Sequence, residues 1–205
     1  MTLHAAVTAI ARGGVIAMPT DTVFGLACDP ASAAAVDRIY AIKRRPAGLE
    51  LTLLSASVDE IERDVELSAT ARALAEAYWP GALSIICTLR ARRWAIPRTG
   101  TTLSVRVPDH PVALDLLRRT GPLASTSANR HGEPPATTAA EVVAALGDEV
   151  DAVVEGGSCG GLASTIIDCT SNTPHVLREG PITIAALRRL LGGSPSTSTE
   201  GQRSQ

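Results

Sequence analysis

The stretch Val15-Ile16-Ala17-Met18-Pro19-Thr20-Asp21-Thr22 decides how the fold is interpreted. Its first four residues are apolar and predict a short buried strand, which runs into a polar turn that begins at the proline. The helical pattern that precedes the strand ends at Gly13-Gly14. A helix, a glycine turn and a buried strand in succession indicate a sheet with helices packed against it.

Helical and strand patterns alternate on both sides of this segment, which predicts the α/β class. Helices are expected at 3–12, 30–42, 68–78, 111–119, 138–146 and 183–191, and strands at 51–54, 83–89, 103–107, 123–126, 152–155, 165–169 and 175–177. We expect Asp29 to cap the second helix, with Pro30 in its first position. Thr138 and Glu141 predict a capping box. Residues 1–192 are expected to form one domain, and the polar residues 193–205 a disordered tail.

The composition is that of a soluble globular protein, with 45% hydrophobic and 20% charged residues among 205. Aromatic residues make up only 2%, which argues against a surface that stacks nucleic-acid bases. The net charge of −2 provides no global field for nucleic acid or for a membrane surface. We therefore expect no DNA partner and no membrane association.

The N-terminus shows neither a basic nor an apolar leader segment, so no signal peptide is expected. No apolar run approaches the roughly 20 residues that span a bilayer. The cysteines form no C-x-x-C pair and the histidines show no metal-ligand spacing, so no protein-bound metal site is expected. These features predict a cytoplasmic protein with reduced thiols.

One motif suggests a hydrolase but lacks the context that the motif needs. Residues 156–160 match G-x-S-x-G, the nucleophile elbow of α/β-hydrolases. An elbow leads from a strand into a helix, whereas a glycine-rich stretch here continues into the strand expected at 165–169. We therefore expect a loop without a nucleophile. The chain also contains no P-loop and no dinucleotide-binding glycine motif.

Lys43 is the only lysine among 19 basic residues. A chain that otherwise uses arginine is expected to keep a lysine where a compact ammonium with three donors is needed, although chance can also leave one. If the backbone is extended, Lys43 and Arg45 lie on one side and can clamp a phosphate. Basic residues at the end of a helix also suit the helix dipole, so both explanations stay open.

A second polar group, Ser125-Thr126-Ser127-Ala128-Asn129, closes the strand expected at 123–126. Hydroxyls and an amide at the carboxyl end of a strand can hydrogen-bond a nucleotide. An ordinary Asn/Ser turn contains the same residue types. The residues alone leave these two interpretations open.

Seven segments, in order over residues 15–191, together resemble the YrdC/TsaC family. Residues 19–26 (PTDTVFGL) resemble its P-T-(D/E)-T-V-Y-G-L, 43–46 (KRRP) its K-x-R-P, and 127–129 (SAN) its S-x-N. Residues 78–83 (YWPGAL), 104–110 (SVRVPDH), 164–168 (STIID) and 177–180 (LREG) resemble W-P-G-x-(L/T), V-R-x-P-x-H, S-T-(I/V)-(I/V)-D and L-R-x-G. The resemblance implies a twisted open mixed β-sheet flanked by helices around a central concave groove. The short single-domain form of the family is the better comparison.

The activity that this resemblance implies is L-threonylcarbamoyladenylate synthesis, a nucleotidyltransferase reaction. L-Threonine takes up CO2 from bicarbonate, and the carbamate oxygen attacks the α-phosphorus of ATP with release of pyrophosphate. Such a transfer depends on positioning and charge neutralisation. The implied partners are ATP, L-threonine and bicarbonate, with Mg2+ on the ATP, followed by a threonylcarbamoyl-transfer complex and the tRNA that receives N6-threonylcarbamoyladenosine.

The resemblance also implies a role for each matching residue. The catalytic residues that hold the nucleotide phosphates would be Lys43, Arg45, Ser127 and Asn129, and Thr102 and Arg178 would also lie near ATP. The threonine-binding residues would be Thr22, Arg106, Ser125 and Ser164. Arg106 would pair with the threonine carboxylate, because a planar guanidinium can bind a carboxylate through two hydrogen bonds.

The sequence departs from the family pattern after Pro46. Members usually continue with a basic residue and a proline where this chain has Leu49 and Glu50. The contacts of this loop with threonine or carbamate therefore stay open. Phe24 replaces the usual tyrosine, and His131 stands where serine is common.

Two other functions stay open on the sequence. A concave, partly basic groove could bind double-stranded RNA, which proteins recognise mainly by shape and backbone. A carbamoyl-adenylate enzyme with a different acceptor would also fit the departure at Leu49 and Glu50. A salt titration of RNA affinity tests the first, and a panel of amino acids in an ATP–pyrophosphate assay tests the second.

Overall fold

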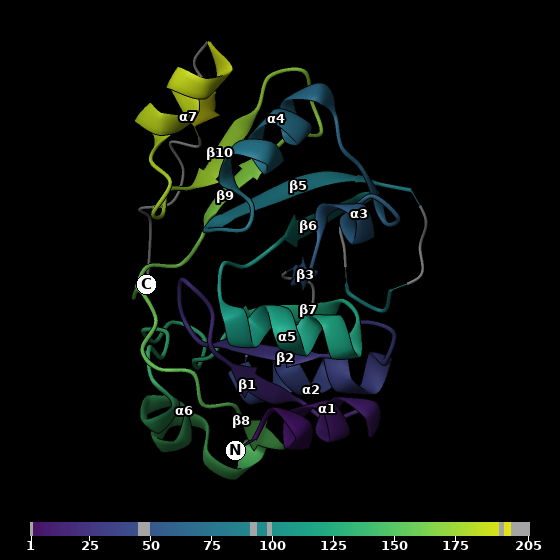
Figure 1. Ribbon diagram of the computed structural model, residues 1–205, viewed down its shortest axis with the longest axis vertical. Coiled ribbons are helices and arrows are strands. Elements are labelled where there is room, and N and C mark those ends of the chain that lie inside the picture. Colours follow the sequence, from purple (N-terminus) through teal and green to yellow (C-terminus); the bar gives the residue numbers. More distant parts are fainter. Residues whose placement is uncertain (1, 45–49, 91–93, 98–99, 193–194, 198–205) are drawn as a thin grey trace.

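The computed structural model describes residues 2–44, 50–90, 94–97, 100–192 and 195–197. Within these ranges eleven strands form one mixed sheet in the order β11-β10-β9-β5-β6-β3-β7-β2-β1-β8, with β4 paired to β5 (Figure 1). The strands are β1 (Ile16–Met18), β2 (Gly25–Cys28), β3 (Thr52–Leu54), β4 (Val65–Glu66), β5 (Leu83–Leu89), β6 (Thr102–Arg106), β7 (Leu123–Ser127), β8 (Ala152–Val153), β9 (Thr165–Asp168), β10 (His175–Arg178) and β11 (Ser196–Thr197). The helices are α1 (Leu3–Ala11), α2 (Ala33–Lys43), α3 (Val58–Ile61), α4 (Ala69–Tyr78), α5 (Pro111–Thr120), α6 (Ala139–Leu146), α7 (Ile184–Leu191) and a 3-10 turn, η1 (Gly147–Glu149). The predicted α/β class and open mixed sheet are confirmed.

One face of the sheet carries the larger hydrophobic core. Alternate strand residues such as Leu26, Leu53, Ile85 and Val105 are fully buried in it, because successive side chains of a strand point to opposite faces. Helices α2, α3, α4, α6 and α7 contribute buried side chains to the same cluster. This face is therefore apolar along most of the sheet.

The opposite face carries a smaller core, which extends from β8 to β3. Ile16 and Met18 of β1 pack there with Ile10 of α1 and Leu116 of α5. The two helices contact each other, and they lie in the lower half of Figure 1 near β1, β2 and β8. Leu54 of β3 and Leu123 of β7 belong to the same cluster, and beside it polar side chains of the middle strands line a pocket on this face.

The start of α2 differs from the prediction. The N-cap is Ser32, whose Oγ accepts a hydrogen bond from the Ala35 amide at 3.2 Å. The Asp29 carboxylate instead accepts from the Ala31 amide at 2.9 Å and closes a turn before the helix. The Pro30 carbonyl accepts from the Ala95 amide at 2.7 Å, so a contact distant in sequence holds this segment outside the helix. The capping box of Thr138 and Glu141 is confirmed.

Several short elements were not predicted, and β2 matters most for the site. It pairs antiparallel with both β1 and β7, so residues 19–24 form the connection between β1 and β2. In the segment expected to be a disordered tail, Ser196–Thr197 pair with β10 as β11, which differs from that expectation at these two residues. Positions 193–194 and 198–205 lie outside the described residues, so the boundary at 192 stays a prediction.

Candidate functional site

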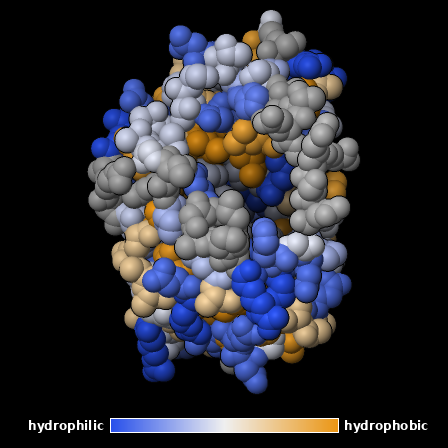
Figure 2. Space-filling model, turned by 180° about the vertical axis from the view of Figure 1, so that it is seen from behind, coloured by the Kyte–Doolittle hydropathy of each residue, from blue (hydrophilic) through white to orange (hydrophobic). Residues whose placement is uncertain are grey.

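A polar pocket lies over the middle strands, on the sheet face that also carries α1 and α5, and has a volume of about 180 Å³. Its lining comes from strands on both sides of the sheet centre and from the β1–β2 connection: Thr20, Thr22, Val23, Gly25, Glu50, Thr52, Leu54, Ser84, Arg106, Ser125, Thr126, Ser127, Ala163, Ser164, Ile166 and Arg178. The surface seen from behind is also hollowed near its middle (Figure 2).

Strand alternation explains why this face is rich in hydroxyl groups. Thr52, Ser84, Ser104 and Ser125 each adjoin an aliphatic residue that points into the larger core. Thr52 Oγ1 and Ser104 Oγ lie 3.0 Å apart, and Ser84 Oγ and Ser164 Oγ lie 2.9 Å apart. Paired hydroxyls satisfy each other inside the protein, so the sheet can bury them without leaving a polar atom unpaired.

Arg106 is the most buried cation in the lining, with a side chain 6% exposed. Its Nε donates to the Gly81 carbonyl at 2.8 Å, Nη1 to Thr22 Oγ1 at 3.0 Å, and Nη2 to Asp21 Oδ1 at 2.6 Å. A guanidinium carries five N–H donors, so these contacts use three of them. Among the residues that the structure describes, the other N–H group on each Nη has no partner, and Arg106 itself lines the pocket.

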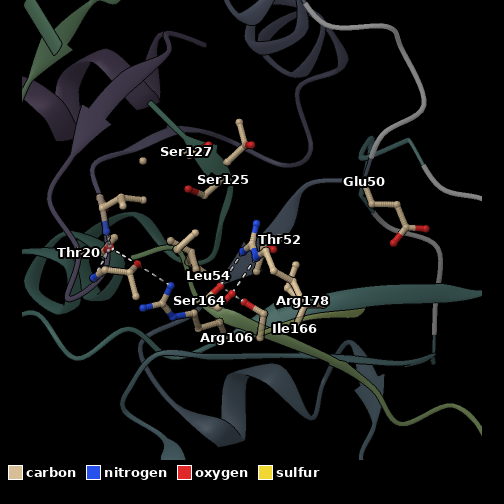
Figure 3. Close-up of a pocket in the computed structure, with 16 residues that line it drawn as sticks. Thr20, Glu50, Thr52, Leu54, Arg106, Ser125, Ser127, Ser164, Ile166 and Arg178 are labelled. Atoms are coloured by element: carbon tan, nitrogen blue, oxygen red, sulfur yellow. Dashed lines mark hydrogen bonds between the residues drawn. The ribbon is translucent and has the colours of Figure 1, made fainter. Parts of the chain in front are cut away.

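Burial lowers the pKa of Arg106, the facing Asp21 carboxylate raises it in opposition, and the nearby Arg178 guanidinium lowers it further. Arg178 Nε donates to the Ser164 carbonyl at 3.0 Å and its Nη2 to Ser164 Oγ at 3.3 Å. In Figure 3 both arginines and Ser164 lie on one side of the pocket, with Ser125 and Ser127 on the other. Two cations at one wall favour an anionic ligand.

A β-bulge places Arg178 in this pocket. In β10, Val176 pairs with Ile167, but Arg178 pairs with Ile166, so the register shifts by one residue between them. Val176 points into the core, and unbroken alternation would send Arg178 to that same face. The extra residue of the bulge turns the Arg178 side chain to the opposite face of the sheet, where the pocket lies.

The β1–β2 connection is held by its own threonine side chains. Thr20 Oγ1 lies 2.9 Å from Thr22 Oγ1 and donates to the Val23 carbonyl at 2.6 Å. Both threonines are buried, at 4% and 2% exposure. The Thr22 hydroxyl is thereby fixed in the position where it meets Arg106.

Lys43 lies beside the other wall of the pocket and is 3% exposed. Its Nζ donates to the Ser127 carbonyl at 2.7 Å, to Asn129 Oδ1 at 2.9 Å and to the Asn129 carbonyl at 3.0 Å. Ser127 Oγ also donates to Asn129 Oδ1 at 2.6 Å. These contacts join the end of α2 to the end of β7, so Lys43, Ser127 and Asn129 form one cluster.

The structure brings most predicted site residues together. Those that line the pocket are Thr22, Arg106, Ser125, Ser127, Ser164 and Arg178, and Lys43 and Asn129 adjoin it through Ser127. Thr102 is not among the lining residues; it begins β6, opposite Thr88 of β5. Arg45 and Leu49 lie outside the described residues.

Sequence reasoning missed several residues of the site. Thr52 and Ser84 line the pocket, and alternation of polar and aliphatic residues within 52–54 and 83–89 could have indicated them. Asp21 stands inside a quoted motif, but nothing in its neighbours in sequence indicates that it meets Arg106. Glu50 also lines the pocket, and Figure 3 places it apart from the arginines and serines.

Other predicted features can be checked against the described ranges. Residues 156–160 form a loop between β8 and β9, so the G-x-S-x-G match has no helix after it, as expected. The residues that the structure describes contain no group of three or more His, Cys, Asp or Glu side chains that could hold a metal ion. None of the helices in those ranges has the length and apolar character needed to cross a membrane.

Fold and site together define an α/β protein with a hydroxyl-rich pocket lined by two arginines. The Sua5/YciO/YrdC family model, described as "Telomere recombination", matches residues 8–180. The chain is 40% identical over 185 residues to the threonylcarbamoyl-AMP synthase of Xanthomonas oryzae pv. oryzae, which covers 87% of this chain and 98% of that protein. This chain therefore belongs to the Sua5/YciO/YrdC family, and the resemblance identified from its motifs is confirmed.

Solved structures give the same result. The structure of P. abyssi Sua5 complexed with L-threonine matches with a TM-score of 0.90 and 30% identity, covering 98% of this chain and 62% of that one. The chain thus spans less than two thirds of the P. abyssi protein. The crystal structure of E. coli YciO matches with a TM-score of 0.78 and 30% identity, over 87% of this chain and 89% of that one.

Proposed function

We propose that this chain is a threonylcarbamoyl-AMP synthase, a nucleotidyltransferase that forms threonylcarbamoyl-AMP and pyrophosphate from L-threonine, bicarbonate and ATP. One observation supports this most. A single pocket is lined by residues expected to hold the amino acid (Thr22, Arg106, Ser125 and Ser164) and by residues expected to hold the nucleotide (Ser127 and Arg178). Family relatives that carry this enzyme's name cover nearly the whole chain.

The amino acid would bind at the Arg106 wall. The two remaining Nη N–H groups of Arg106 can bind a carboxylate through two hydrogen bonds, a geometry that a planar guanidinium suits. Thr22, Ser125 and Ser164 would then face the rest of the substrate, and the L-threonine found in the P. abyssi protein agrees with an amino acid of this kind. Low exposure strengthens such contacts, because water competes less for the same groups.

The nucleotide would bind toward the Lys43 cluster. Ser127 offers a hydroxyl to the pocket, and Lys43 stands directly behind it with its charge 2.7 Å from the Ser127 carbonyl. Lys43 would therefore neutralise phosphate charge and keep the 127–129 turn in place. Arg178 would supply the second positive charge from the opposite wall.

The reaction needs positioning more than a protein nucleophile. The threonine amine takes up CO2 from bicarbonate to give a carbamate, with loss of water. A carbamate oxygen then forms a bond to the α-phosphorus as the bond from that phosphorus to the pyrophosphate oxygen breaks. Cations on both walls would balance the charge that develops on pyrophosphate.

Mg2+, tRNA and cellular location belong to the same proposal. Mg2+ would enter with ATP and be held mainly by phosphate oxygens, which suits a site whose described residues offer no carboxylate cluster. The product would pass to a threonylcarbamoyl-transfer complex that modifies tRNA in the cytoplasm.

Pyrophosphate release tests this function directly. We expect release with ATP, Mg2+, bicarbonate and L-threonine together, and none when threonine or bicarbonate is omitted. Mass spectrometry should find threonylcarbamoyl-AMP in the complete mixture. Release that does not depend on threonine would overturn the proposal, and an amino-acid panel in the same assay would then identify another acceptor.

A further inference from the structure

Asp21 lies behind Arg106 and not in the pocket. Its carboxylate Oδ1 accepts a hydrogen bond from Arg106 Nη2 at 2.6 Å and another from the Asp109 amide at 3.1 Å. Thr20 and Thr22 on either side of it line the pocket, whereas Asp21 is absent from the described lining. The side chains of the pair are 6% and 17% exposed, so the contact is largely shielded from water.

The three anchors of Arg106 come from different parts of the chain. Gly81 precedes β5, while Asp21 and Thr22 belong to the β1–β2 connection. Three acceptors around one planar group leave it little freedom to rotate, so the two other Nη N–H groups keep a fixed direction. Asp21 provides the only ionised acceptor among these three.

The carboxylate has a second, opposing effect. Asp21 reduces the net positive charge at the wall, which weakens long-range attraction for an anion. Arg178 adds a further cation at this wall, close enough to depress the Arg106 pKa (Figure 3). The effect of Asp21 that favours anion binding is therefore the orientation of Arg106, to which Thr22 and Gly81 also contribute.

We propose that Asp21 is a positioning residue for amino-acid binding: it orients the Arg106 guanidinium, whose free N–H groups then bind the substrate carboxylate. The inference rests on the proposed function, and it adds a residue with a defined role and a defined partner. Asp21 acts on the amino acid through Arg106 and does not touch it. Its effect is therefore confined to one of the substrates.

The experiment compares Asp21→Ala, Asp21→Asn and wild type in the pyrophosphate assay, with threonine and ATP varied in turn. Asp21→Ala is expected to raise the KM for L-threonine about 10- to 100-fold, the usual effect of losing one hydrogen bond to a charged group. The KM for ATP should stay within about twofold. Asp21→Asn should recover most of the loss, because its amide oxygen can accept the same two hydrogen bonds.

Two controls separate positioning from a general structural role. Asp115→Ala removes the carboxylate from an exposed pair with Arg119, with side chains 44% and 54% exposed, and should leave both KM values unchanged. In an Arg106→Ala background, Asp21→Ala should cause no further loss in kcat/KM for threonine, since coupled residues are not additive. Circular dichroism and the melting temperature of each variant report folding.

The outcomes distinguish the inference from the function on which it rests. Wild type without threonine-dependent release would refute the proposed function. With wild type active, equal rises in both KM values, or additive losses with Arg106→Ala, would refute the role of Asp21. If Asp21→Ala does not fold, the Asp21→Asn/Arg106→Ala double variant decides: a loss in kcat/KM for threonine beyond that of Arg106→Ala alone would overturn the inference.

Discussion

The two buried cations at this site are held in different ways. Arg106 meets a carboxylate, a hydroxyl and a carbonyl, which use three of its five N–H donors. Lys43 has three donors, and two carbonyls and one amide oxygen lie within 3.0 Å of its Nζ. Arg106 can thus donate to a ligand without losing a contact, whereas Lys43 already joins two elements of the protein.

This difference indicates two kinds of contribution. Arg106 offers directed hydrogen bonds, and its identity as arginine matters for their geometry. Lys43 offers charge and holds the turn at 127–129, where a compact ammonium fits between convergent oxygens. The predictions below test each wall of the pocket separately.

The largest effect is expected from Arg106→Ala. It removes the proposed carboxylate contact and leaves Asp21 without its cation. Truncating one partner of a buried hydrogen-bonded charge pair costs about 2–5 kcal/mol, so kcat/KM for threonine should fall about 1,000-fold. Steady-state kinetics measures this change in kcat/KM. A decrease of less than about tenfold would contradict direct binding of the carboxylate by Arg106.

A somewhat smaller effect is expected from Lys43→Arg. The charge stays, but a planar fork cannot place its donors on the three oxygens that converge on the ammonium. We expect pyrophosphate release to fall about 100-fold with the fold retained, on the order of one lost hydrogen bond to a charged group. The matched control is Arg118→Lys on the exposed face of α5, which should have no effect. A fully active Lys43→Arg enzyme would show that charge alone suffices.

Gly25→Ala should impair threonine binding through Ser125. A Cβ at Gly25 would lie 2.8 Å from Ser125 Oγ, so the serine hydroxyl must move out of its place in the pocket. Overpacking of this kind costs about 1–3 kcal/mol, and we expect the threonine KM to rise about tenfold. Adding Ser125→Ala should restore the melting temperature but not the KM. Restored activity in that double variant would exclude a role for the Ser125 hydroxyl.

The smallest effect is expected from Ser84→Ala. Ser84 is 1% exposed, and its hydroxyl supports Ser164 much as Asp21 supports Arg106. Loss of one buried neutral hydrogen bond costs about 1 kcal/mol, so the threonine KM should rise about fivefold. A change in the KM for ATP of the same size would mean that Ser84 serves the whole pocket.

Much of the fold could be predicted from local patterns. The strands at 83–89 and 123–126 and the capping box at Thr138 follow from alternation and from cap chemistry, both of which involve residues a few positions apart. The start of α2 could not be predicted in this way, because a hydrogen bond between Pro30 and the distant Ala95 holds the Asp29–Pro30 segment outside the helix. Strand β2 contains a glycine, which weakens the strand signal, and it is stabilised by pairing on both sides.

Motifs in order and residue periodicity are properties of the chain alone, so they were sufficient to predict the family, the α/β class and six of the residues that line the pocket. Tertiary structure decided how those residues meet. A bulge in β10 turns Arg178 into the pocket, and the β1–β2 connection brings Asp21 to Arg106 across 85 positions. Such contacts depend on sheet register and loop path, which are set by packing of the whole domain and not by neighbours in sequence.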